Sequence, residues 1–311
     1  MTTLMLLAGL VLLLLGGEVL VRGAAALAER FGVPSFVIGV VVVGFGTSAP
    51  ELVTSVEAAL IGAPGIAVGN IVGSNIANIL LILGLTAALM PIAVDRAVLR
   101  RDGSVALAVA VACLGLAMLD IVDRLTGALL VAGLVAYVYV TVRHPTCPDC
   151  PAPQDAGAGA APTRLPVAVL LSLAGLVMVV FGADLLVSAA VILARSTGIS
   201  ESVIGLTVVA VGTSLPELAT SLVAAMRRQA DIALGNILGS NIYNVLGILG
   251  VTAIVEPIDI PDDIAGTDIW VMVAATLLLM VFAATGRRIC RLEGFGFLAL
   301  YGGYIGWLTV G

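Results

Sequence analysis

Ten apolar stretches follow one another along the 311-residue chain, most of them close to the roughly 20 residues that a helix needs to cross a bilayer. Hydrophobic residues make up 60% of the chain and charged residues only 11%, whereas soluble domains carry about 25% charged residues. The sequence therefore predicts an all-α polytopic membrane protein and excludes a water-soluble globule. The stretches lie near residues 3–22, 35–61, 65–89, 104–119, 122–142, 165–194, 201–226, 231–255, 267–286 and 293–310.

The second half of the chain repeats the first. A shift of 166 positions aligns residues 16–92 with 182–258 without a gap, and about 28 of the 49 positions from Gly44 to Ile92 are identical. We expect two repeats of five helices each, at 1–142 and 165–311, whose most similar segments are about 44–92 and 210–258. Because five is odd, the two repeats must enter the membrane in opposite orientations, which predicts an inverted-topology repeat.

The charged residues predict the orientation in the membrane. All fourteen basic residues are arginine, and only Arg124 and Arg195 fall on one of the two predicted sides. By the positive-inside rule the other side is cytoplasmic, which puts both termini outside an inner (plasma) membrane. The polar linker 143–164 is then cytoplasmic. It holds the only histidine and a lone C-x-x-C, which is half a zinc site at best.

Two carboxylates interrupt apolar stretches near their middle. Glu51 and Glu217 occupy equivalent positions in the second and seventh stretches, where a charge costs about 2.5–3.5 kcal/mol on insertion scales. Pro50 and Pro216 precede them, and a proline removes a helical hydrogen bond and clashes with the carbonyl four residues earlier. We therefore expect helices 2 and 7 to be broken near mid-membrane. Glu18, near a helix end, is instead expected to anchor its helix at the membrane interface.

The stretches that follow each break carry a polar face. Its members recur every fourth residue, so they share one side of a helix, and we expect them to supply hydroxyl and amide oxygens opposite the glutamates. Calcium prefers six to eight such hard oxygens, while the absence of histidine and cysteine argues against zinc, copper or iron. The two faces are Asn70, Ser74 and Asn78, and Asn236, Ser240 and Asn244.

Structural explanations for these residues stay open. Ser48-x-x-Glu51 and Ser214-x-x-Glu217 match the capping box that begins many helices. The asparagines could hold helices together, and the glycines could allow close packing. Their joint duplication around a mid-membrane charge favours a cation site over a scaffold.

The paired motifs resemble a known family. G-T-S-A-P-E (46–51) with G-N-I-V-G-S-N-I (69–76), and their copies at 212–217 and 235–242, are similar to the two α-repeats of the cation/calcium antiporter superfamily, specifically the sodium/calcium exchangers and their prokaryotic relatives. The resemblance implies exchange of Na⁺ for Ca²⁺ by alternating access, in which the first and sixth helices slide past a core of helices 2–3 and 7–8. It implies a transporter with no cofactor, not an enzyme.

The resemblance also implies roles for individual residues. Glu51 and Glu217 would be shared acidic ligands, and Asn78 and Asn244 would line the centre. Several family members carry an acid at the position of Asn244. The remaining implied ligands are the backbone carbonyls of Thr47 and Thr213, the flanking sodium-site residues Ser48, Ser74, Ser214 and Ser240, and the carbonyls of Gly44 and Ala210.

Other functions are weighed against this one. The close rival is an H⁺-coupled or K⁺-dependent cation exchanger on the same scaffold, because only two central carboxylates are predicted. A cation channel could also use half-helices, but two buried acids favour stoichiometric binding. An intramembrane hydrolase would need the acids to share one water. The predicted partners are Ca²⁺, Na⁺ and the lipid bilayer; no nucleic acid or protein partner is inferred.

Overall fold

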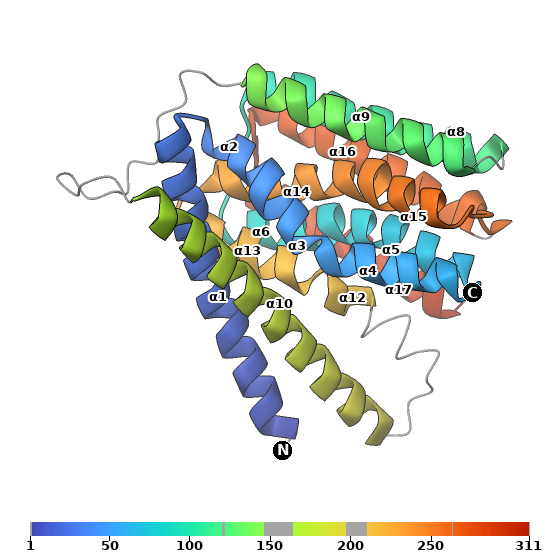
Figure 1. The fold of residues 1–311 in the computed structure, drawn as a ribbon, viewed down its shortest axis with the longest axis horizontal. Helices are drawn as coiled ribbons and strands as arrows, with labels where there is room; N and C mark the ends of the chain where they lie inside the picture. The colour runs from blue at the N-terminus through green and yellow to red at the C-terminus, as the bar shows by residue number, and fades with distance from the viewer. Residues whose placement is uncertain (1, 120–121, 146–163, 197–209, 263, 311) are drawn as a thin grey trace. The chain divides into compact units, whose positions relative to one another are not determined.

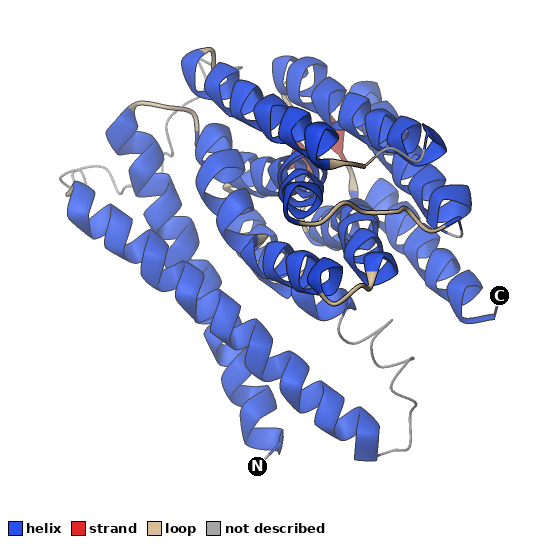
Figure 2. Ribbon diagram, turned by 45° about the vertical axis from the view of Figure 1, so that its right-hand side comes forward, coloured by secondary structure: helices blue, strands red, loops and turns tan. Residues whose placement is uncertain are grey.

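The structure is a computed structural model that describes residues 2–119, 122–145, 164–196, 210–262 and 264–310. Within these ranges the elements are almost all helical (Figure 2). Seven of the described helices are long and apolar enough to cross a membrane, or eight if a bent pair of helices counts as one span. The predicted class of an all-helical polytopic membrane protein is confirmed at this level.

Two sequence predictions lie wholly or partly outside the described residues. Most of the predicted linker, including Cys147 and Cys150, belongs to the undescribed range 146–163, and the seventh predicted span loses its first part to the range 197–209. What the structure describes of that span includes the short apolar helix Leu215–Met226.

The chain divides into two compact units. Unit 1 comprises Met1–Pro50 and Cys150–Asn236, and unit 2 comprises Glu51–Asp149 and Ile237–Gly311. The boundaries fall inside α4 (Ala49–Leu60) and α14 (Ala230–Tyr243). The other elements of unit 1 are α1 (Thr2–Phe31), α2 (Ser35–Ile38), the π-helical η1 (Gly39–Gly44), α3 (Phe45–Thr47), α10 (Leu165–Ser196), α12 (Ala210–Thr213) and α13 (Leu215–Met226).

Unit 2 contains one of the two most buried spans and, from Ile237 on, the larger part of the other. These run through Pro64–Leu89 and Ala230–Val255, which are 72% and 83% buried, whereas the other spans are 28–39% buried. The elements of unit 2 are α5 (Pro64–Ala77), η2 (Asn78–Leu83), α6 (Gly84–Leu89), β1 (Ile92–Ala93), α7 (Arg96–Val98), η3 (Leu99–Gly103), α8 (Ser104–Leu119), α9 (Arg124–Arg143), η5 (Asn244–Leu249), α15 (Gly250–Val255), η6 (Ile264–Asp268), α16 (Ile269–Gly286), β2 (Arg288–Ile289) and α17 (Arg291–Val310).

A short strand pair in unit 2 corrects the purely helical prediction. β1 and β2 pair in antiparallel register, with Ile92 opposite Ile289, and the Val94 N–H donates to the Arg287 carbonyl at 2.8 Å. The pair joins the segment after α6 to the segment after α16. Extended backbone in these two segments leaves N–H and C=O groups that need partners, and pairing satisfies them.

A buried carboxylate near α8 was also not predicted. Asp102 is fully buried, where it accepts from the Tyr137 hydroxyl at 3.0 Å and pairs with Arg101 at 3.0 Å. The fourth span begins at Arg96, eight residues before the predicted start at position 104. Asp102 could therefore enter the helical region, because a charge that is paired and hydrogen-bonded can be buried.

In unit 1, α1 and α10 lie side by side with close backbones (Figure 1). A Cβ atom added at Gly175 would lie 2.3 Å from the Leu20 nitrogen, and one at Gly182 would lie 2.8 Å from the Leu13 nitrogen. From the other side, a Cβ at Gly9 would lie 2.8 Å from the Gly182 carbonyl oxygen. Glycine at these positions is therefore what lets the two helices approach, as in other membrane helix pairs.

Glu18 adds a polar link to this unit. Its carboxylate lies 2.7 Å from the Arg22 guanidinium one turn along α1, and it also pairs with Arg227 at the end of α13. These side chains are partly exposed, so each pair contributes at most about 1 kcal/mol. Glu18 was expected only to anchor its own helix. Its ion pair with Arg227 also links α1 to α13, and the sequence did not predict this link.

We predict that Gly175→Ala destabilises the protein by about 1–3 kcal/mol, because the added methyl would meet backbone that cannot move aside locally. Gly115→Ala on α8 is the matched control, since a Cβ there has no neighbour within 4 Å among the described residues. The control should be neutral or up to about 1 kcal/mol more stable, as expected for glycine replaced by alanine in a helix. Thermal unfolding in detergent measures both, and equal behaviour of the two variants would contradict the close α1–α10 packing.

Candidate cation-binding site

Both predicted helix breaks are present. In the first repeat α3 ends at Thr47, Ser48 has φ −84° and ψ 8°, and the helix axis bends by 43° before α4 continues. In the second repeat α12 ends before Ser214, which has φ −88° and ψ 5°, and α13 follows. These serines lie in the sparsely populated bridge region. Each break comes two residues before the proline, so Pro50 and Pro216 are the second residues of the new helices.

Glu217 is the clearest candidate ligand of unit 1. It is 1% exposed, its Oε1 accepts a hydrogen bond from the Ser48 hydroxyl at 2.9 Å, and no described residue donates to its Oε2. Among the described residues no arginine pairs with it. It lies in the first turn of α13, where the helix dipole favours a negative charge. One carboxylate oxygen is thus fixed and the other can accept a cation.

The capping explanation for Ser214 is wrong. Ser214 is the N-cap residue of α13, but its side chain makes no capping hydrogen bond. Ser48 directs its hydroxyl to Glu217, 169 residues away in sequence, and thereby joins the two repeats. Ser48 and Glu217 therefore do more than begin a local helix.

Asn236 holds the broken helix of unit 1 in place. Its Nδ2 donates to the Glu217 carbonyl at 3.3 Å and to the Ser221 hydroxyl at 2.8 Å. Its Oδ1 lies 3.2 Å from the Thr47 hydroxyl, which also donates to the Val43 carbonyl at 3.0 Å. The Asn236 side chain is therefore occupied by protein groups, and it positions Glu217.

Asn70 makes the same contacts in unit 2. Its Nδ2 donates to the Glu51 carbonyl at 3.1 Å and to the Ser55 hydroxyl at 2.9 Å. Glu51 is 1% exposed in the first turn of α4, as Glu217 is in α13. The amide nitrogens of Asn70 and Asn236 bind the helix that carries the glutamate. The expectation that an amide oxygen faces a cation needs correction at Asn236, whose Oδ1 accepts from the Thr47 hydroxyl, and stays a prediction at Asn70.

A group of four buried asparagines lies in unit 2. Asn78 donates from Nδ2 to Asn241 Oδ1 at 2.9 Å, and Asn244 donates to Asn75 Oδ1 at 3.1 Å. The Asn78 and Asn244 Oδ1 atoms are buried, and no described group donates to them. Each of these two residues begins a π-helical segment, η2 or η5, a distortion that is frequent at functional sites. With their nitrogens engaged, they can offer their oxygens to a cation.

No role was predicted for Asn75 and Asn241. The sequence does mark both residues, since each belongs to a copy of the duplicated G-S-N-I motif. The partner of an amide, and therefore which of its two atoms remains available, depends on tertiary contacts and could not be read from the motif.

Of the other predicted ligands, some belong to unit 1 and some to unit 2. Ser74 and Ser240 are buried in unit 2. In unit 1 the Gly44 carbonyl accepts from the Ser48 N–H at 3.1 Å, and Thr213 and Ala210 are the last and first residues of α12. No group of three or more histidine, cysteine, aspartate or glutamate residues that could hold a metal occurs among the described residues. The candidate ligands are therefore single carboxylates with amide, hydroxyl and carbonyl oxygens, which suit hard cations.

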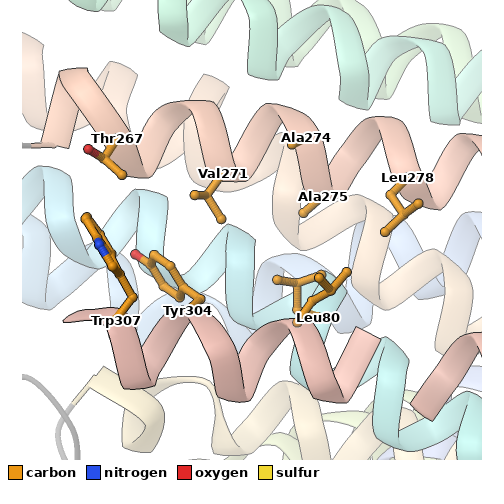
Figure 3. Close-up of a pocket in the computed structure, with 9 residues that line it drawn as sticks. Leu80, Thr267, Val271, Ala274, Ala275, Leu278, Tyr304 and Trp307 are labelled. Atoms are coloured by element: carbon orange, nitrogen blue, oxygen red, sulfur yellow. The ribbon is translucent and has the colours of Figure 1, made fainter. Parts of the chain in front are cut away.

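The cavity drawn in Figure 3 is a different feature. It has a volume of about 330 Å³ in unit 2, between η2, α16 and α17, and residues such as Leu80 and Val271 line it. Tyr304 lies at one end, and its hydroxyl donates to Asp268 at 2.8 Å. Most of the lining of this cavity is apolar, and none of the predicted ligands belongs to the cavity. The cavity is therefore not the cation site.

Comparison with known proteins shows the family of the chain. The family model described as "Sodium/calcium exchanger protein" matches residues 1–143 and 167–310. The chain belongs to the sodium/calcium exchanger family. It is 40% identical to the putative antiporter CaxA of Alkalimonas amylolytica over 97% of both chains, and 33% identical to the sodium/calcium exchanger MaX1 of Methanosarcina acetivorans over 96% of this chain and 95% of that one.

A solved structure is also similar over the full length. The sodium-calcium exchanger NCX_Mj, soaked with Na⁺ and Ca²⁺, superposes with a TM-score of 0.85 at 36% identity, covering 98% of this chain and 97% of that chain. The match supports the all-helical polytopic membrane fold.

We predict that Asn236→Ala lowers the free energy of unfolding by about 1–3 kcal/mol, because it leaves a buried carbonyl and hydroxyl with fewer partners. Thr276→Val is the control, since the buried Thr276 hydroxyl donates within its own helix, to the Met272 carbonyl at 2.8 Å. The control should lose less than about 1 kcal/mol. Chemical unfolding in detergent compares the two, and a loss at Asn236 no larger than at Thr276 would argue against its positioning role.

Proposed function

We propose that the protein is a secondary antiporter that exchanges Na⁺ for Ca²⁺ by alternating access. The observation that carries the proposal is the buried Glu217 carboxylate, with one oxygen held by Ser48 and the other without a donor among the described residues. A buried carboxylate without a cationic partner is costly. A transported cation offsets that cost while it is bound. Membership of the sodium/calcium exchanger family supports the same function.

The ligand set is proposed in full. Glu51 and Glu217 are the acidic ligands, and Asn78 and Asn244 line the centre with their amide oxygens. The burial of all four and the donor-free oxygens of three of them support this assignment. The further ligands are the carbonyls of Thr47, Thr213, Gly44 and Ala210 and the hydroxyls of Ser48, Ser74, Ser214 and Ser240. Ser48 can donate to Glu217 and bind a cation at the same time, since its hydroxyl oxygen keeps lone pairs while the hydroxyl donates.

The proposed architecture has ten helices in two inverted repeats. It is supported by the gap-free duplication and by the matching hydrogen bonds of Asn70 and Asn236. The boundaries are those of the sequence analysis, with repeats at 1–142 and 165–311 and a cytoplasmic linker at 143–164. The arginine distribution supports an inner-membrane protein with both termini outside. The proposed activity is transport, with no enzymatic step and no cofactor beyond the transported ions.

A second coupling ion deserves a test because Asn244 stands where several family members carry an acid. Two glutamates balance one Ca²⁺ to neutrality. Two H⁺ would do the same, whereas three Na⁺ would leave one positive charge. Sodium coupling of this kind is therefore electrogenic and proton coupling is electroneutral. A K⁺-dependent exchanger is the third form that the scaffold allows.

We predict that Ca²⁺ exchange in proteoliposomes responds to membrane voltage. One net charge per Ca²⁺ corresponds to about 2.3 kcal/mol per 100 mV, or roughly a fiftyfold change in the Ca²⁺ gradient at equilibrium. The measurement imposes voltage with a K⁺ gradient and valinomycin and records ⁴⁵Ca. A gradient that ignores voltage and Na⁺ but follows pH would establish the proton-coupled form instead.

We also predict that Glu51→Gln and Glu217→Gln each lower sodium-dependent ⁴⁵Ca uptake at least about tenfold, because each removes a charged ligand. Glu57→Gln is the control, since Glu57 is exposed on the same helix as Glu51 and its repeat counterpart is Val223. The control should keep wild-type uptake. Exchange that survives in both ligand variants would refute the site assignment.

A further inference from the structure

A basic cavity of about 490 Å³ lies in unit 2. One wall comes from the segment through α7 and η3 into α8, and the other from the end of α16. No predicted cation ligand belongs to it. Its lining combines Arg96, Arg100, Arg287 and Ser104 with the apolar side chains of Val94, Leu99, Met280, Ala283 and Ala284.

Among the described residues, no carboxylate pairs with the three arginines of this cavity. The nearest acids in sequence are engaged elsewhere. Asp95 caps α7 by accepting from the Ala97 N–H at 2.6 Å, and Asp102 is held by Arg101 and Tyr137. All three arginines are exposed to solvent, so water screens most of their mutual repulsion. Their guanidinium groups can bind an anion without first breaking an ion pair to a described carboxylate.

Arg287 is placed in the cavity wall by an unusual backbone. It is the C-cap residue of α16 with φ 50° and ψ 28°, in the left-handed region that favours glycine. Gly286 precedes it directly. Its carbonyl accepts from the Val94 N–H, and the β1–β2 pair follows. The backbones of the two walls of the cavity are therefore joined by hydrogen bonds.

We propose that this cavity binds an anionic phospholipid, with the phosphate on the arginines and the upper acyl chain on the apolar wall. Guanidinium groups bind phosphate through paired hydrogen bonds, and basic pockets between membrane helices bind anionic head groups. Inorganic phosphate would use the arginines but leave Met280 and Ala284 uncovered. The mixed lining therefore favours the lipid over the free anion.

The test measures binding of dioleoyl-phosphatidylglycerol to the purified full chain by native mass spectrometry. The variant is Arg96→Gln with Arg100→Gln and Arg287→Gln, and the control is Arg30→Gln, an exposed arginine at the end of α1. At about fivefold per arginine, the triple variant should bind roughly a hundredfold more weakly. The control should match the wild type. Unchanged affinity in the triple variant, or equal binding of dioleoyl-phosphatidylcholine to the wild type, would overturn the proposal.

A second variant separates the lipid from a free anion. Ala284→Trp fills the apolar wall and keeps all three charges, so it should weaken phosphatidylglycerol binding while inorganic phosphate is bound as in the wild type. Phosphatidylglycerol binding that is unchanged in Ala284→Trp would overturn the lipid assignment in favour of a free anion. If the triple variant does not elute as a folded protein on gel filtration, each single arginine variant should still show its fivefold loss, and the absence of that loss would overturn the proposal.

Discussion

A carboxylate buried in a membrane protein must be compensated, and much of the candidate site of unit 1 can be understood as compensation for Glu217. The Ser48 hydroxyl fixes one oxygen, the α13 N-terminus lies beside the charge, and Asn236 holds the carbonyl of the same residue. None of these groups carries a full positive charge. These groups leave the negative charge of the carboxylate without a full positive counter-charge, and we propose that a transported cation supplies it.

The two repeats hold their buried glutamates with equivalent hydrogen bonds. Asn70 and Asn236 each donate to a glutamate carbonyl and to a serine hydroxyl on the broken helix. Asn78 and Asn244 each donate to a neighbouring asparagine and begin a π-helical segment. Amide nitrogens thus bind protein, and the oxygens of the second pair stay available. Duplication of a motif that holds a carboxylate gives the chain two acids in equivalent settings.

The features of the structure that follow from local physics were predictable from the sequence. A proline in an apolar stretch predicts a broken helix, and both breaks lie within two residues of Pro50 and Pro216. The role of Asn236 could not be predicted in the same way, because the orientation of its amide depends on Thr47 and Ser221. The pairing of Asp102 with Tyr137 likewise joins residues 35 positions apart, and no local pattern marks it. The sequence supplied the candidate ligands, and tertiary contacts decided which of their atoms are available.

The most direct test of this account is a crystal structure of the protein grown with Ca²⁺. The account predicts a calcium ion about 2.3–2.6 Å from the Glu217 Oε2 atom, at the usual calcium–oxygen distance, with Ser48 still bound to Oε1. A structure in which Ca²⁺ lies elsewhere and Glu217 Oε2 accepts a hydrogen bond from a protein donor would contradict it.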